Sequence, residues 1–164
     1  MSFKWSKKTI DKTYGFKLEQ FNSENNMFHA IYFIDSISGA VLVSNKYSNM
    51  LDTDDDLISG FLVAMNMFIR EIGKDKSEEI EEINFRGSRI LYERKGRLLC
   101  VGVSKKTNLQ IERGILHQIL DDFYNKFEFQ INRFNGVIDP AILDYKKQLK
   151  NLNLNNTFKF GMNF

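Results

Sequence analysis

Four aspartates, at positions 52 and 54–56, stand directly in front of a long apolar run. Alternating acids at positions 52, 54 and 56 match the first three ligand positions of an EF-hand calcium loop. The rest of that loop fails, because its glycine position holds Leu57 and its bidentate glutamate position holds Val63. A helix start explains the same acids, since Thr53 or the aspartate after it can cap the first N–H groups and the helix dipole favours negative charge there. The sequence therefore favours a helix N-terminus over a metal site.

Candidate nucleophiles and bases are few: the chain has two histidines, His29 and His117, and one cysteine, Cys100. A nucleophile needs a base within hydrogen-bond reach, and neither histidine lies in a catalytic motif. His117 borders an apolar stripe and is predicted to be partly buried or on the surface, whereas Cys100 lies within an apolar strand and is predicted to be a small core residue. Nucleophile-elbow, metalloprotease and phosphate-binding motifs are absent. We expect no catalytic residue, no cofactor and no enzymatic activity.

Composition fits one soluble globular domain, with 164 residues of which 43% are hydrophobic and 27% charged. No apolar run approaches the roughly 20 residues of a membrane helix, and the basic N-terminus lacks the apolar centre of a signal peptide. A single cysteine excludes an internal disulfide and agrees with a reducing compartment. These features predict a cytoplasmic protein. The sequence pI of about 8.6 is too mild to indicate a nucleic-acid partner.

Charge is segregated along the chain. Residues 51–82 hold ten acids against three bases, and residues 86–113 hold eight bases against two acids. Such asymmetry suits a protein that binds a partner, although ordinary solvated faces produce it as well. Both interpretations stay open at the level of sequence.

Apolar periodicity predicts a hairpin and then a helix. Residues 28–34 and 40–44 are β-branched and aromatic, with Gly39 where the turn needs an unrestricted backbone. A helix that buries one wide face is predicted next, and Gly73 is its natural stop. The stripe that defines the buried face comprises Leu57, Ile58, Phe61, Leu62, Met65, Phe68, Ile69 and Ile72.

Three short strands and two helices complete the predicted domain. Residues 81–85, 88–93 and 97–103 form an antiparallel meander. A long helix begins near Asn108, and Asp139 caps a shorter helix that opens at Pro140. The long helix has an inward stripe of Ile111, Ile115, Leu116, Ile119, Leu120, Phe123, Tyr124 and Phe127, and the short helix one of Ile142, Tyr145 and Leu149. The order strand, strand, helix, three strands, helix, helix predicts an α+β fold with one five-stranded antiparallel sheet.

The chain divides into an N-terminal basic segment, residues 1–26, a domain, residues 27–150, and a C-terminal tail, residues 151–164. The first segment could form a helix, with Gly15 as a weakness and a stripe of Ile10, Tyr14, Leu18 and Phe21. Its balance over residues 1–20 is five lysines against two acids. Lys4, Lys7 and Lys8 beside Phe3 and Trp5 suit weak peripheral attachment to an anionic membrane.

The tail is rich in asparagine and alternates Phe158, Phe160, Met162 and Phe164 with polar residues. This period of two indicates a strand laid on a sheet edge or a flexible peptide with hydrophobic anchors. The hypothesis for these four residues is that they fold back onto a sheet edge or groove of the same domain and regulate access of a partner.

The segments "IYFIDSISGAVLVS", "DDDLISGFLVAMNMFIREIG" and "INFRGSRILYERKGRLLCVGVS", in this order, resemble the longin and roadblock domains. The likeness covers about residues 28–128 and includes the hairpin turn with Asp35 and Gly39 and the strand from Gly87 to Tyr92. A third helix at residues 140–149 favours the longin branch, because roadblock domains instead carry a helix before the first strand, which residues 10–21 could be. A hybrid of the two stays open.

The resemblance implies a non-catalytic docking and assembly module of the kind that serves small GTPases, their exchange-factor complexes, vesicle adaptors and SNARE proteins. Dimers in this superfamily commonly pair the central helix and the third strand, which implies a partner or dimer interface at Asn66, Arg70, Glu82 and Asn84, with the helical residues facing outward. The implied partner is a small GTPase or another longin or roadblock protein, in a homo- or heterodimer. Ordinary solvent exposure explains the four residues equally well.

A ligand- or peptide-binding domain of the PAS or profilin-like kind is the alternative function, because these domains also pack helices on a five-stranded sheet. Such a sensor requires a concave apolar pocket with a few polar groups.

Overall fold

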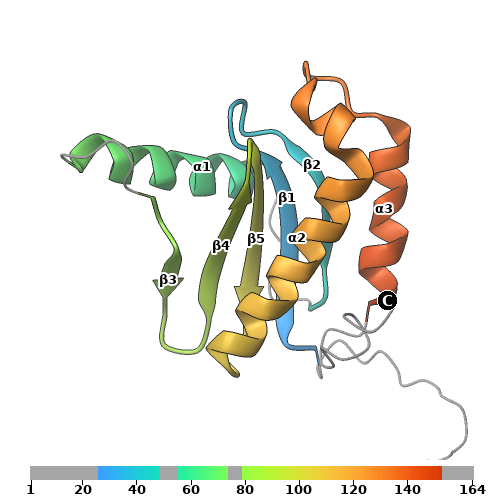
Figure 1. Ribbon diagram of the computed structural model, residues 1–164. Coiled ribbons are helices and arrows are strands. Elements are labelled where there is room, and N and C mark those ends of the chain that lie inside the picture. The colour runs from blue at the N-terminus through green and yellow to red at the C-terminus, as the bar shows by residue number, and fades with distance from the viewer. Residues whose placement is uncertain (1–25, 49–54, 74–78, 153–164) are drawn as a thin grey trace, which may run out of the picture.

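A computed structural model describes residues 26–48, 55–73 and 79–152 of the chain. Its elements follow the predicted order (Figure 1): β1 (Phe28–Asp35), β2 (Val41–Lys46), α1 (Asp55–Ile72), β3 (Glu82–Asn84), β4 (Arg89–Lys95), β5 (Leu98–Ser104), α2 (Leu109–Asn132) and α3 (Pro140–Asn151). All strand pairs are antiparallel, in the sheet order β2-β1-β5-β4-β3. The predicted α+β class with a five-stranded antiparallel sheet is confirmed.

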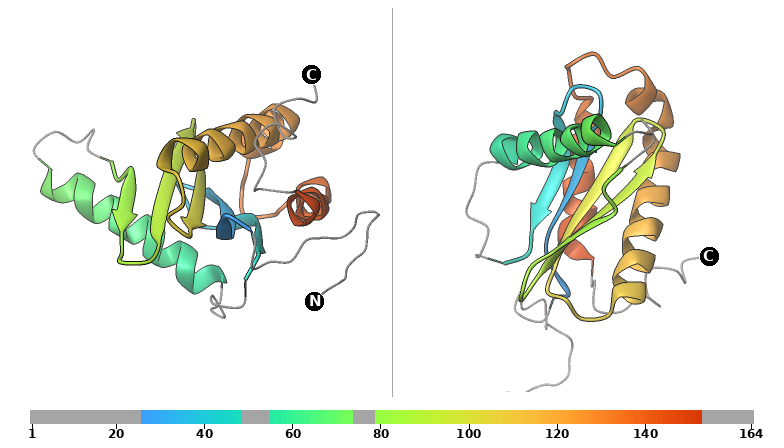
Figure 2. Two further views of the ribbon diagram at one scale, coloured as in Figure 1. Left: turned by 90° about the horizontal axis from the view of Figure 1, so that it is seen from below. Right: turned by 90° about the vertical axis from the view of Figure 1, so that its left-hand side faces the viewer.

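Helices cover both faces of this sheet. Seen from below, α1 lies alone on one side, and α2 and α3 lie on the other (Figure 2). All eight residues of β1 are buried, because the strand lies between two neighbours and under helices on both faces. This double cover explains why "FHAIYFID" is almost continuously apolar instead of alternating. The sheet therefore separates two apolar cores.

The larger core lies between the sheet and the pair α2 and α3. Phe33 of β1 stacks on Phe123 of α2 with ring centroids 4.1 Å apart, and Tyr145 of α3 meets Phe123 edge-on at 4.9 Å. The Tyr145 hydroxyl donates to the Asp122 carboxylate at 2.7 Å, so the polar tip of this buried ring has a partner. Ile142, Tyr145 and Leu149 are all buried, which confirms the predicted inward face of α3.

Helix ends fall close to the predicted positions. The Asn108 side chain accepts from the Ile111 N–H at 3.1 Å, and the Asp139 side chain accepts from the Ala141 N–H at 2.8 Å. The Gly73 N–H donates to the Ile69 carbonyl at 3.0 Å at the end of α1. The residues proposed to cap the start of α1, Thr53 and Asp54, lie outside the described residues.

Two sequence predictions need correction in this part of the fold. The strand bounds differ from those predicted by one or two residues, as expected where pairing depends on the neighbouring strand. Ile111 was assigned to the inward stripe of α2 but is 42% exposed, because the first turn of α2 lies beyond the apolar core. The inward position of Ile115, Leu116 and Phe123 is confirmed.

A buried carboxylate ties together one end of the sheet. Asp35, at the end of β1, is 1% exposed, and its two oxygens accept from Arg97 Nε at 2.6 Å and Arg97 Nη2 at 3.0 Å. The N–H and hydroxyl of Ser38 donate to the same carboxylate at 2.9 and 2.6 Å. Arg97 also reaches the carbonyl of Phe134 at 3.4 Å, between α2 and α3. One ion pair thus joins the β1–β2 turn, the β4–β5 turn and the α2–α3 connection.

The pKa of Asp35 is held below its usual range. Burial alone would raise it, but the hydrogen bonds from Arg97 and Ser38 and the charge of Arg97 favour the ionised form and outweigh burial. The carboxylate is therefore charged throughout the neutral pH range.

A close approach between β5 and α2 depends on Gly102. A Cβ atom at this position would lie 2.8 Å from Leu116 Cδ2 and 2.8 Å from Phe28 Cε1. Both neighbouring side chains are fully buried and cannot move aside freely. We expect Gly102→Ala to lower the free energy of unfolding by about 2 kcal/mol through overpacking, measured by urea denaturation.

The matched control for Gly102→Ala is Gly114→Ala within α2, where nothing lies within 4 Å of an added Cβ. Alanine there is expected to raise the free energy of unfolding by about 0.5–1 kcal/mol, because glycine weakens a helix interior. Equal effects of the two substitutions would contradict the close approach described for Gly102.

Candidate interaction surface

Helix α1 rests on the sheet through one strip of side chains. Leu62 is 1% exposed, and Ile58, Met65 and Ile69 are partly buried against the second core. The sheet side of this core is formed by Ala30, Tyr32, Ile34, Tyr92, Leu99 and Val101. Since α1 is the helix on this face among the described residues, its other sides have no described element over them.

The outer side of α1 is also apolar. Its exposed residues are Leu57 at 67%, Phe61 at 53%, Met67 at 62%, Phe68 at 57% and Ile72 at 61%, and these five residues are called the α1 face below. The prediction that Leu57, Phe61, Phe68 and Ile72 point into the core is therefore wrong. The missed signal was the number of apolar positions: with Val63 and Met67 added, they exceed what one face of a helix can hold.

Polar contacts fix the rotation of α1 on the sheet. Asn66 is 8% exposed, and its Oδ1 accepts from Arg94 Nη2 at 2.7 Å and from the Ile80 N–H at 3.2 Å. Arg94 Nη2 also donates to the Ile80 carbonyl at 2.7 Å. Ser59, at 1% exposed, lies on this side of α1 too. These contacts turn α1 toward its polar residues and leave Phe61 and Phe68 outside.

The expectation that Asn66 faces outward is therefore wrong. Its amide anchors α1 to β4 and to the chain just before β3, and substitution would disturb the fold as well as a surface. Arg70, the other helical residue of the predicted interface, is exposed. The two residues do not belong to one surface, because one is buried and the other is not.

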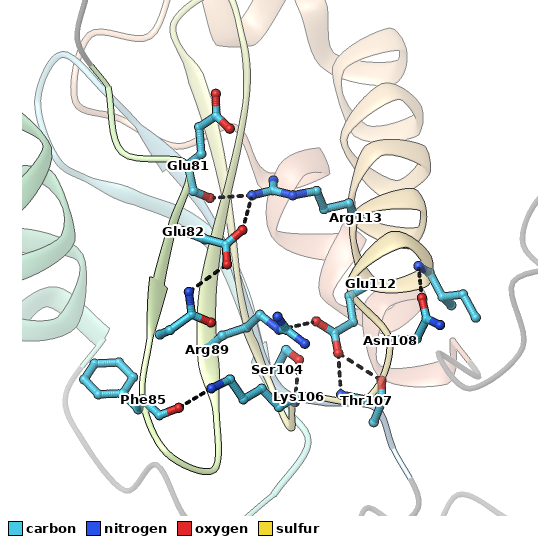
Figure 3. Close-up of polar contacts among 12 residues, drawn as sticks. Glu81, Glu82, Phe85, Arg89, Ser104, Lys106, Thr107, Asn108, Glu112 and Arg113 are labelled. Atoms are coloured by element: carbon cyan, nitrogen blue, oxygen red, sulfur yellow. Dashed lines mark hydrogen bonds and ion pairs between the residues drawn. The ribbon is translucent and has the colours of Figure 1, made fainter.

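The outer strand β3 presents the other two predicted interface residues (Figure 3). Asn84 Nδ2 donates to Glu82 Oε2 at 2.7 Å, and Arg113 Nη2 of α2 contacts Glu82 Oε1 at 3.2 Å. Arg113 also reaches Glu93 of β4 at 2.8 Å and the Glu81 carbonyl at 3.0 Å. The hydrogen bond from Asn84, followed by the contact with Arg113, lowers the pKa of Glu82. The network holds β3 against α2, so Glu82 has a structural role.

The backbone of β3 has a second, outward edge. Pairing with β4 is bracketed by the hydrogen bonds Phe85 N–H to Ser88 carbonyl, 2.8 Å, and Tyr92 N–H to Glu81 carbonyl, 3.0 Å. Because antiparallel pairs alternate, the N–H and C=O groups of Glu82 and Asn84 point away from β4. Since β3 is last in the sheet order, this edge can receive a further strand.

Groups able to do chemistry lie far from the α1 face. His29 Nδ1 lies 2.8 Å from the Ser48 hydroxyl, and burial, followed by the charge of Lys105, lowers the pKa of His29. Cys100 is fully buried, as predicted, and burial raises the pKa of its thiol. His117 is 63% exposed and lies 3.3 Å from Asp121, one turn along α2. None of these side chains pairs a nucleophile with a base.

Metal and membrane features were sought over the same residues. Within residues 26–48, 55–73 and 79–152, no group of three or more histidine, cysteine or acidic side chains is placed to hold a metal ion. None of the described helices is both long enough and apolar enough to cross a membrane. The predicted tail residues Phe158, Phe160, Met162 and Phe164, and the acids at positions 52–54, lie outside the described part of the chain.

Known proteins offer one distant likeness. No protein-family model and no curated protein sequence matches this chain. Among solved structures, it is similar to a chain in a homology model of the full-length AP-3 complex in a stretched open conformation, with 11% sequence identity and a TM-score of 0.37. That likeness covers 75% of this chain and 93% of the other. At this identity and score it carries no argument about function.

Proposed function

We propose that this protein is a non-catalytic protein–protein interaction module that binds its partner through the α1 face and the free edge of β3. In this proposal it serves as an assembly subunit of a small-GTPase-regulating or membrane-trafficking complex. Its partner is a second copy, a related longin- or roadblock-like subunit, or the GTPase itself.

The observation that carries the proposal is the apolar outer side of α1. A helix that is hydrophobic all round is normally buried on every side, yet the five residues of the α1 face are each more than half exposed. Contiguous apolar patches of several hundred Å² are uncommon on proteins that act as monomers and usually mark binding sites. Aromatic and methionine side chains such as Phe61, Met67 and Phe68 are also enriched in protein interfaces.

The edge of β3 supplies the main-chain component of such an interface. A strand of the partner can add to the outward N–H and C=O groups of Glu82 and Asn84 while a helix or strand covers the α1 face. Glu82 and Asn84 then act through position on the edge, and Arg70 through its exposed charge. The contribution of Asn66 is to hold α1 in place, by its contacts with Arg94 and Ile80.

The resemblance to longin and roadblock domains supports the choice of partner class. The element order that carried the resemblance is the order of the folded domain. A non-catalytic role agrees with the separation of the histidines and the cysteine described above.

The α1 face is tested by molar mass in solution, using light scattering coupled to gel filtration over a concentration series. We expect the wild-type chain to approach twice its 19.2 kDa mass as concentration rises, if the partner is a second copy. Phe61→Glu places a charge in the apolar interface and is expected to weaken association at least tenfold, about 1.4 kcal/mol. Leu143→Glu on α3 is the control, because Leu143 is 51% exposed, close to the 53% of Phe61, but lies on the opposite side of the sheet.

A heteromeric partner is tested by mixing the protein with candidate small GTPases in both nucleotide states and with longin or roadblock subunits. Association that Phe61→Glu removes and Leu143→Glu preserves supports the proposal. A monomer at every concentration that also associates with none of these proteins contradicts it.

A further inference from the structure

The α1 face needs a cover while the chain has no partner. Its five residues expose an apolar surface that would otherwise attract other proteins without selectivity. A cover within the same chain would have to be apolar on one side, long enough to follow α1, and complementary in charge to its surroundings.

Charge around α1 favours a basic cover. The segment that contains α1, residues 51–82, holds ten acids against three bases. Within the described residues, Glu71, Glu79 and Glu81 are exposed at the end of α1 and before β3. The N-terminal segment has the opposite balance, five lysines against two acids in residues 1–20. The C-terminal tail, residues 153–164, has Lys159 as its one charged side chain, so its attraction to this region is weaker.

The spacing of apolar residues in the N-terminal segment suits a helix that lies along α1. Ile10, Tyr14, Leu18 and Phe21 recur at intervals of four, four and three. Ser6 is a good N-cap, and Trp5 and Ile10 then occupy the two positions of a hydrophobic staple, which brings the indole to the apolar side. Gly15 weakens the helix, and helices of this length are marginal alone in water. Such a helix therefore depends on docking for its stability.

The segment is long enough to reach α1. Fifteen residues of helix, 7–21, span about 22 Å, and the four extended residues 22–25 add about 13 Å. The eight-residue β1 spans about 27 Å. Figure 1 shows α1 crossing the sheet near the end opposite to the start of β1, so the connection must cover about the length of one strand.

We propose that residues 3–21 dock, as a basic amphipathic helix, on the α1 face of their own chain, and that a partner must displace them to bind. This inference rests on the proposed function of that face, and adds that the face is autoinhibited. Release would be favoured by a partner that offers a larger apolar contact, or by an anionic surface that binds the lysines.

Fluorescence of Trp5 tests the proposal directly, because it is the one tryptophan of the chain. In the full chain, at a concentration where light scattering gives a monomer, we expect blue-shifted emission and reduced quenching by iodide or acrylamide. Phe68→Glu should shift the emission toward that of an exposed indole, and so should Leu18→Glu, which lies outside the domain and cannot unfold it. Phe129→Glu is the matched control, since Phe129 is 66% exposed on α2, on the far side of the sheet.

Deletion variants separate the other occupants of the α1 face. Removing residues 1–25 is expected to increase binding of an apolar dye several-fold, and Phe68→Glu should reverse that gain. An exposed indole in the wild-type monomer would overturn the proposal, as would a gain in dye binding on deletion of residues 153–164 instead. Association that depends on Phe61 while Trp5 is exposed would preserve the proposed function and overturn only the autoinhibition. Docked Trp5 without partner association has the reverse meaning.

Discussion

Replacing Asp35 by asparagine is expected to lower the free energy of unfolding by about 3 kcal/mol, the low end of the range for breaking a buried ion pair from one side. The carboxylate accepts four hydrogen bonds, two from Arg97 and two from Ser38. The amide keeps the shape but loses the charge, which leaves the Arg97 guanidinium, 21% exposed, without its counter-ion. Because three connections meet at this pair, urea denaturation should report the loss for the whole domain.

The control for Asp35→Asn is Lys95→Ala at the same β4–β5 turn. Lys95 and Asp121 form an ion pair at 3.0 Å whose side chains are 40% and 39% exposed. An exposed pair of this kind contributes about 0–1 kcal/mol. A similar cost for the two substitutions would contradict the special role of the buried pair.

The effect of Asp35→Asn should also depend on pH. The unfolded carboxyl has a pKa of about 3.9, and the folded one a lower pKa. As pH falls below about 4, the unfolded chain binds the proton first, so protonation favours unfolding. The stability from Asp35 is therefore complete above that pH and lost as pH falls through the folded pKa. The difference between wild type and Asp35→Asn should narrow over this window in acid-titrated urea melts.

Replacing Glu112 by glutamine should have a comparable effect, about 3 kcal/mol. This glutamate, in the first turn of α2, is fully buried, and its Oε2 accepts from the N–H of Thr107 at 2.6 Å and the Thr107 hydroxyl at 2.9 Å. Its Oε1 lies 2.9 Å from Arg89 Nε as an ion pair that lacks the alignment of a hydrogen bond (Figure 3). Arg89 is 13% exposed, so removing the negative charge leaves a largely buried cation unpaired.

A double-mutant cycle checks this account of Glu112. Arg89→Met alone and Glu112→Gln alone should each be costly, whereas the combination should cost less than their sum, because neither charge is then left without its partner. The free energies come from urea denaturation of all four proteins. Additive costs would show that the two side chains stabilise the fold independently.

Local patterns were enough to predict the element order. The caps Asn108 and Asp139 and the turn at Gly39 act through backbone groups two or three residues away, so the sequence contains both partners. Gly39 has a φ of +82°, the conformation for which a glycine was expected. The fold class follows from such local signals and their order.

The rotation of α1 could not be predicted in this way. Its apolar residues form two adjacent strips, and periodicity alone does not say which strip meets the sheet. Arg94 and Ile80, which bind Asn66, decide the matter, and they lie 28 and 14 residues away along the chain. The same limitation made Asn66 appear to be a surface residue, because an asparagine in an apolar helix is usually placed outside unless its partner is known.

The unequal thickness of the two cores implies unequal local stability. Twenty buried residues make the core under α2 and α3, whereas eight make the core under α1, of which Leu62 is the one from the helix itself. Elements with few buried contacts open with less free energy than global unfolding requires. Helix α1 is thus a separate opening unit, whose amide hydrogens exchange while the sheet and the opposite helices stay closed. A bound partner would slow this exchange in α1 before it changed any other part of the domain.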